Sequence, residues 1–183
     1  MSGLRFQIVF HTPFRVSTGA AHAGIDAVID RDDPLPATSL KGLMRATATA
    51  LLGDAPIIAA VFGSPATPTP WRWSAATPDS DGWHTPKPAA RVTIDPDTHT
   101  ARPDMLGTAE QTGATSATFT VTPRHPLPTD TLDLHRLVLA VAGQATRSLG
   151  GNRRRGLGWV AITCPDIALD TAATRRFLDL RTP

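Results

Sequence analysis

The chain has 183 residues, of which 41% are apolar, 18 are basic and 16 are acidic. That length and composition predict one globular domain with a hydrophobic core, and they exclude wholesale disorder. A formal net charge of +2 is too weak to imply polyanion binding by net charge alone.

The number of cysteines and the hydropathy pattern exclude further classes of protein. Cys164 is the only cysteine, so a disulfide or a cysteine-based zinc site within one chain is excluded. The sequence contains no apolar run that approaches the length of a membrane span, and its N-terminus lacks a signal-peptide pattern. We therefore expect a cytoplasmic protein without membrane contact.

The predicted elements run strand, helix, strands, helix, strand. Alternating apolar residues predict a first strand at Leu4–Phe10, and an apolar stripe ending at Gly53 predicts a helix capped by Thr38 or Ser39. The later elements are predicted as strands at residues 91–94 and 117–122, a helix at 131–150, a strand within 156–164 and a short helix within 171–181. This order is typical of an α+β fold, a ferredoxin-like antiparallel sheet with helices on one face.

Residues 63–89 interrupt this pattern. The segment is rich in proline, has no core periodicity and contains Trp71, Trp73 and Trp83. We interpret it as a protruding loop or hairpin inserted into a single domain, residues 1–183. Exposed tryptophans there would form a contact surface; the alternative is that they pack back on the domain.

The segment SLGGNRRRGLGWV, residues 148–160, places three consecutive arginines between pairs of glycines. Burying three unpaired charges is too costly for a core, whereas guanidinium groups bind phosphates in a bidentate manner. Glycine also allows a backbone to come close to a ligand. The segment therefore predicts an anion-binding loop made of Gly150, Gly151, Asn152, Arg153, Arg154, Arg155 and Gly156. A solvated turn or a contact between subunits are the alternatives.

The start of the first helix carries a second set of candidates. Phosphates bind well at helix N-termini, where Ser39 offers a hydroxyl, and Lys41 and Arg45 share one face because they are four residues apart. The alternative for these two cations is a solvated helix face.

These pieces occur together in a familiar order. The stretches GIDAVIDRDDPLPATSLKGLMR, VFGS, RVTIDPDTHTA, TFTV and LGGNRRRGLGWV resemble the repeat-associated mysterious protein (RAMP) superfamily of CRISPR systems. Within it, the chain most resembles the repeated backbone subunit of type III effector complexes, the Csm/Cmr kind.

The resemblance implies an RNA-recognition-like core whose copies stack as a filament along a CRISPR RNA, beside other effector subunits. It implies that the anion-binding loop at residues 150–156 and the start of the first helix touch the guide. Residues 63–89, with Trp71, Trp73 and Trp83, would form a thumb that kinks the duplex of guide and complementary target RNA.

The resemblance also implies cutting of target RNA beside each kink. Asp26 matches the aspartate that acts there with a divalent metal, Mg²⁺ or Mn²⁺, and no organic cofactor is expected. One alternative is a structural filament subunit in which Asp26 is an ordinary loop residue. Another is a metal-independent CRISPR RNA-processing endoribonuclease that uses His11 and His22, although such enzymes resemble two joined ferredoxin-like units and this chain has length for one.

Overall fold

The computed structural model describes residues 3–22, 24–79 and 81–181, with the side chain of Arg154 outside the described part. Its main sheet is antiparallel throughout. Strand β1 (Leu4–Phe10) lies between β6 (Ser116–Pro123) and β7 (Val160–Thr163), and β6 also pairs with β2 (Trp71–Trp73) and β3 (Thr77–Pro78). The order β2–β6–β1–β7 confirms the predicted ferredoxin-like arrangement, because the first and third principal strands occupy the centre.

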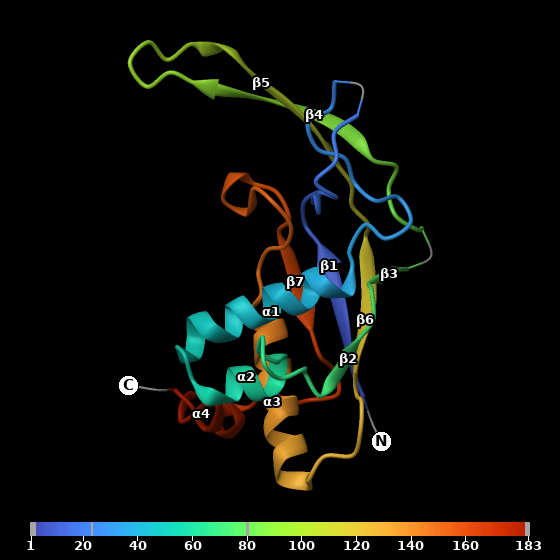
Figure 1. Ribbon diagram of the computed structural model, residues 1–183, viewed down its shortest axis with the longest axis vertical. Helices are drawn as coiled ribbons and strands as arrows, with labels where there is room; N and C mark the ends of the chain where they lie inside the picture. Colours follow the sequence, from blue (N-terminus) through green and yellow to red (C-terminus); the bar gives the residue numbers. More distant parts are fainter. Residues whose placement is uncertain (1–2, 23, 80, 182–183) are drawn as a thin grey trace.

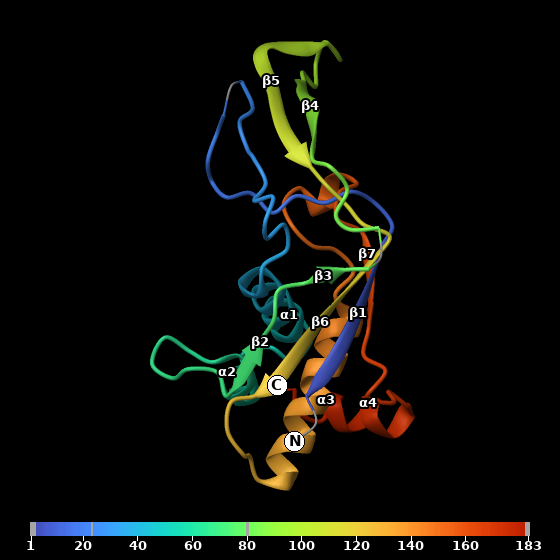
Figure 2. The same ribbon diagram turned by 90° about the vertical axis from the view of Figure 1, so that its right-hand side faces the viewer.

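Two long helices, α1 (Ala37–Leu52) and α3 (Thr129–Ala145), pack together against one face of this sheet (Figures 1 and 2). Two shorter helices, α2 (Pro56–Phe62) and α4 (Thr171–Leu178), complete the helical side. Within the described residues, every helix is too short or too polar to cross a membrane.

The core lies between the sheet and the two long helices. Every second residue of β1, namely Leu4, Phe6 and Ile8, is at most 1% exposed. The Phe6 ring stacks on Phe119 of β6, with 4.8 Å between the ring centroids. Gly143 of α3 lies so close that a Cβ there would stand 2.7 Å from the Phe6 ring. The glycine therefore lets α3 approach β1 directly.

Two predicted helix ends need correction. Helix α1 begins at Ala37 after Pro36, not at a Thr38 or Ser39 cap, and the Ser39 amide donates to the Pro36 carbonyl (3.0 Å). Pro36 has the extended backbone that precedes a helix, so the helix starts two or three residues earlier than a cap at Thr38 or Ser39 would allow. Helix α3 ends at Ala145 rather than near residue 150, because Thr146 turns extended.

A long hairpin protrudes from the sheet and rises above the rest of the chain (Figures 1 and 2). It consists of β4 (Lys87–Ile94) and β5 (Ala101–Gln111), which pair in antiparallel register. Only residues 87–89 belong to the predicted insertion of 63–89. The prediction of where the chain protrudes was therefore wrong, since most of 63–89 forms β2, β3 and their connections at the sheet edge.

The three tryptophans of 63–89 pack inward. Trp71 is fully buried, and its indole N–H donates to Nδ1 of His135 (3.3 Å). Trp73 and Trp83 are half-buried against the core. Trp73 stacks on Phe119, while Trp83 meets Phe10 and Phe14 edge-on, as the ring contacts show. A duplex contact by Trp71 is thus excluded, and the tryptophans serve the core because large aromatic surfaces gain most from burial.

Candidate nucleic-acid interface

The arginine loop, residues 148–158, is tied to the segment that follows β1. The Gly151 amide donates to the Arg15 carbonyl, and the Gly158 amide donates to the Pro13 carbonyl, both at 2.8 Å. Gly150 and Gly158 have φ values of +75° and +71°. A Cβ would stand 2.3 Å from the Arg15 carbonyl oxygen at Gly150 and 1.9 Å from that of Leu149 at Gly158. These glycines therefore allow close approach within the chain rather than to a ligand.

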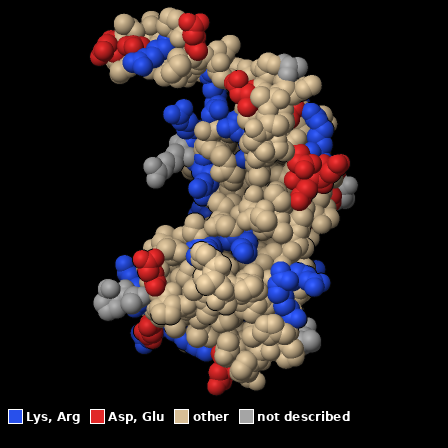
Figure 3. All heavy atoms as spheres, viewed as in Figure 1, with Lys and Arg blue, Asp and Glu red and all other residues tan. Residues whose placement is uncertain are grey.

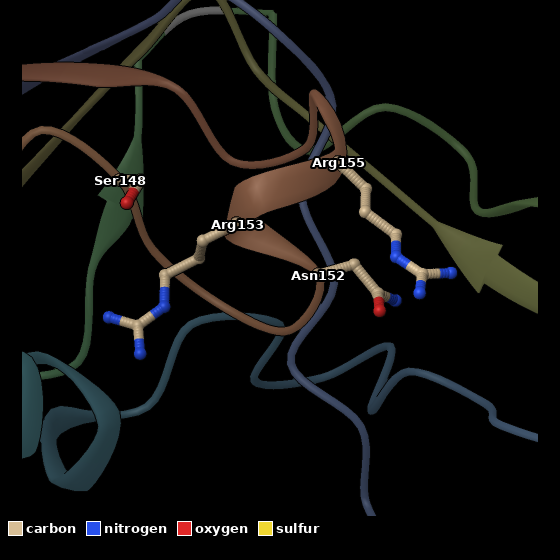
Figure 4. Close-up of a pocket in the computed structure, with 4 residues that line it drawn as sticks. All are labelled: Ser148, Asn152, Arg153 and Arg155. Atoms are coloured by element: carbon tan, nitrogen blue, oxygen red, sulfur yellow. The ribbon is translucent and has the colours of Figure 1, made fainter.

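This anchoring presents the arginine side chains to solvent. Arg153 and Arg155 lie in a single 3₁₀ turn and are exposed, and Figure 4 shows them pointing in different directions. Arg153 points to the side of Ser148, whereas Arg155 lies beside Asn152 (Figure 4). Together these four residues line an open cavity of about 610 Å³. Arg154 was also predicted to bind the anion, and its side chain lies outside the described part of the structure.

A second cavity joins the arginine loop to the first helix. It has a volume of about 490 Å³, and its lining includes Ser39 of α1 together with Gly150, Gly151 and Arg153. The helix contributes the face of Ser39, Gly42, Leu43 and Ala46, which follows the i, i+3, i+4 spacing. Two regions that are far apart in the sequence thus meet as expected.

The other two candidates of the first helix do not line this cavity. Lys41 is partly buried and Arg45 exposed, and both lie on a different side of α1 from Ser39. Their role in RNA binding stays a prediction.

The face of the molecule that carries the loop is hollowed and rich in basic side chains (Figure 3). Figure 3 shows a hollow between the protruding hairpin and the helical body, and lysine and arginine side chains line much of it. The arginine loop projects into the same hollow (Figure 1). A charged concave surface with flanking low-dielectric walls concentrates ligands of opposite charge.

Asp26 lies at the root of the hairpin. Its Oδ2 accepts a hydrogen bond from the Thr108 amide (2.7 Å), and its own amide donates to the Thr108 carbonyl (2.7 Å). The carboxylate is nevertheless exposed. This pairing with β5 was beyond sequence reasoning, since no local pattern links the loop of Asp26 to a strand 82 residues later.

The side chains around Asp26 determine which kind of metal site this aspartate could form. Among the described residues, no cluster of three or more His, Cys, Asp or Glu side chains could hold a metal ion. Mg²⁺ is commonly bound by one or two carboxylates together with substrate phosphates and water. The chemistry of Asp26 therefore fits a Mg²⁺ or Mn²⁺ ion that is shared with an RNA phosphate, since the described residues offer no metal site built from protein ligands alone.

The family is established by comparison with known proteins. The sequence profile of the RAMP superfamily matches residues 7–161. The chain belongs to the RAMP superfamily. The match runs from the first strand to the last strand of the sheet and includes the hairpin and the arginine loop, so it confirms the resemblance of the sequence motifs.

Chains of two solved structures of type III-B Cmr-beta share the fold. One chain of a type III-B Cmr-beta complex bound to cognate target RNA, studied by cryo-electron microscopy, gives a TM-score of 0.64 at 13% identity, covering 90% of this chain and 97% of that one. A chain of the apo type III-B Cmr-beta complex gives 0.63 at 12% identity, covering 89% and 97%. A search of curated proteins gives no match.

Proposed function

We propose that this RAMP protein is a backbone subunit of a type III CRISPR effector complex that binds the CRISPR RNA guide. The observation that carries the proposal is the cavity shared by Ser39 of α1 and the arginine loop. Its polar side chains are the hydroxyls of Ser17 and Ser39 and the guanidinium groups of Arg15 and Arg153. These groups suit phosphate and sugar rather than base edges. A subunit that grips any guide sequence needs that chemistry.

The likeness to chains of Cmr complexes supports the same proposal. One of those complexes is bound to target RNA, and its chain is covered almost completely by this one. The partners we propose are CRISPR RNA, complementary target RNA, further copies of this chain stacked in a filament, and other effector subunits.

Salt dependence tests guide binding. For single-stranded nucleic acid, the logarithm of affinity falls by about 0.7 per neutralised phosphate for each unit of log salt. Three to five contacts per subunit therefore predict a slope of roughly 2 to 3.5. Arg153→Gln should lower the slope by less than one unit. Arg72→Gln is the matched control, because Arg72 is also exposed but lies on β2 and lines neither cavity of the loop. An equal effect of both variants would contradict the assignment.

Target RNA cutting at Asp26 is the enzymatic part of the proposal. Its carboxylate can accept the proton of the attacking 2′-hydroxyl, which positions Asp26 as a general base. A divalent ion bound with the RNA would stabilise charge on the phosphoryl oxygens. The two hydrogen bonds with Thr108 attach Asp26 to β5 near the hairpin root and so fix the position of its carboxylate.

Asp26→Asn separates this chemistry from structure. An asparagine oxygen still accepts the Thr108 amide, so the loop should stay in place while the base is lost. Loss of a positioned base predicts at least about 100-fold slower target cutting in the assembled complex, with RNA affinity unchanged.

Asp30→Asn is the matched control for this test. Its carboxylate caps the turn at Asp32 and Asp33, an interaction that asparagine retains, so cutting should continue. Full cutting by Asp26→Asn would refute catalysis and leave a structural filament subunit. Metal-independent cutting of the CRISPR repeat would instead favour the histidine-based processing enzyme.

A further inference from the structure

A third cavity lies between the arginine loop and the root of the β4–β5 hairpin. Its volume is about 210 Å³, and three arginines from separate segments line it: Arg15 after β1, Arg91 on β4 and Arg155 in the arginine loop. Among the described residues, none of the three arginines forms an ion pair. Three cations are therefore gathered around one small space.

The electrostatics of this cavity favour an anion. Burial, together with the charge of Arg91, lowers the pKa of Arg15, although a guanidinium stays protonated at neutral pH. One carboxylate, that of Glu110, also lines the cavity. It already accepts hydrogen bonds from the Ile29 amide (3.0 Å) and from Arg31 (2.7 Å). The repulsion between the lining arginines is thus not offset by Glu110 alone.

The side-chain amide of Asn152 is a second feature that favours a bound anion. Asn152 lines this cavity, and its side-chain nitrogen Nδ2 is buried without a hydrogen-bond partner among the described residues. A buried donor without a partner is costly, so it indicates that the site is built for an acceptor. Figure 4 shows the Asn152 amide beside the Arg155 guanidinium, which lets both donate to one group.

The walls of the cavity are held in place by backbone pairing. Phe14 and Thr112, the latter just beyond the end of β5, exchange two hydrogen bonds of 2.7 and 2.9 Å. On the other side, the Gly151 amide donates to the Arg15 carbonyl (2.8 Å). The segment containing Arg15 is thus joined to both the arginine loop and the hairpin root, and the donors are positioned before a ligand arrives.

We propose that Arg15, Arg91, Arg155 and Asn152 form a phosphate site, and that one phosphodiester of the bound RNA occupies it and joins the hairpin to the body. The inference rests on the proposed function, because RNA supplies the phosphate. The cavity is several times the roughly 30 Å³ of a water molecule but smaller than the roughly 300 Å³ of a drug-sized site, which suits a phosphate group. It shares Arg155 and Asn152 with the first cavity and Arg15 with the second, so a backbone following the loop reaches all three.

Single-charge variants of the full chain test the site through the salt dependence of RNA binding. With a single-stranded RNA of mixed sequence, Arg15→Gln and Arg91→Gln should each lower the slope by up to about 0.7. Arg102→Gln is the matched control. Arg102 lies on the same hairpin and pairs with Asp95 at 3.1 Å, but it does not line the cavity. Its slope should match that of the unaltered protein.

Amide hydrogen exchange tests, independently of RNA affinity, whether the bound phosphodiester joins the hairpin to the body. At saturating RNA, amides of residues 87–94 and 101–111 should exchange more slowly in the unaltered protein and in Arg102→Gln, but not in Arg91→Gln. Inorganic phosphate at the same total phosphate concentration should give no such protection. Protection by inorganic phosphate that RNA does not increase would overturn RNA as the occupant.

The failures can be told apart. If the unaltered protein binds RNA and Arg153→Gln lowers the slope, but Arg91→Gln behaves like Arg102→Gln, the phosphate site is wrong and guide binding stands. If the unaltered protein shows no salt-dependent RNA binding, both proposals fall. Because Arg15 and Arg91 lie on separate segments, a folding defect in one variant leaves the other as a valid test.

Discussion

Two glycines of the arginine loop should respond very differently to alanine. Gly156 and Gly158 both have left-handed backbone, with φ values of +81° and +71°. A Cβ at Gly156 would meet nothing within 4 Å, whereas a Cβ at Gly158 would stand 1.9 Å from the Leu149 carbonyl oxygen. We therefore expect Gly156→Ala to be tolerated and Gly158→Ala to displace the loop.

The magnitudes follow from these contacts. Left-handed backbone costs an alanine about 1–2 kcal/mol, and a stiffer unfolded chain returns about 0.4–1 kcal/mol, so Gly156→Ala should cost between about 0 and 1.6 kcal/mol. At Gly158, the contact must open from 1.9 Å to at least 3.4 Å. That movement breaks the hydrogen bonds to Leu149 and Pro13, worth about 1 kcal/mol each. The total for Gly158→Ala is about 3 kcal/mol.

Thermal unfolding of the two variants measures the difference. For a chain of this size, 1 kcal/mol corresponds to a change in Tm of about 2–4 °C. Gly158→Ala should lower Tm by roughly 6–12 °C, and Gly156→Ala by no more than about 6 °C. If the two variants unfold at the same temperature, the close packing of the loop on the segment after β1 is refuted. Equal Tm values with a loss of RNA binding in both would instead show that the glycines approach the ligand.

Three further predictions concern buried polar groups. Burial lowers the pKa of His135, whose neutral ring accepts a hydrogen bond from the Trp71 indole N–H. The folded state should therefore lose stability as the pH falls below about 6.5. Urea titrations at pH 7.5 and 5.5 should show a drop in the free energy of unfolding that His135→Phe reduces. Burial raises the pKa of the Cys164 thiol to about 11, so a maleimide at pH 8 should label it far more slowly in the folded chain than in urea. Glu110 is 4% exposed and accepts a backbone amide as well as Arg31, so Glu110→Ala should cost about 2 kcal/mol of unfolding free energy, whereas Arg31→Ala, with an exposed side chain, should cost under about 1 kcal/mol.

The sheet and the long helices could be predicted because their patterns are local. Strand β1 alternates buried and exposed residues without interruption, so its period of two is visible in the sequence. Helix α1 carries a buried stripe that ends at a glycine with positive φ. These elements also fix the chain order, and the order determined the ferredoxin-like sheet. The same order of elements predicted that the arginine loop connects the second long helix to the last strand, as it does between α3 and β7.

The outer part of the hairpin could not be predicted because it has no buried face to create a pattern. Residues 101–106 of β5 are all exposed, and Leu106 is 66% exposed although it is apolar. Trp71, in contrast, lies in a proline-rich stretch and is fully buried. Composition therefore suggested that residues 63–89 protrude and that residues between 95 and 116 are turns, which reverses the arrangement in the structure.

The candidate site divides in the same way between local and distant signals. Ser39 and the arginine loop were found because each belongs to a short motif, and the fold then brought them to one cavity. Arg15 belongs to no motif, and Arg91 opens the stretch RVTIDPDTHTA, in which nothing singles out the arginine as an anion ligand. The pairing of Phe14 with Thr112 carries the segment of Arg15 to the hairpin root. A charge cluster assembled by tertiary pairing leaves no periodic trace in the sequence. The contribution of Arg91 must therefore be measured on the folded chain, where its loss should affect both the salt slope and the exchange of the hairpin.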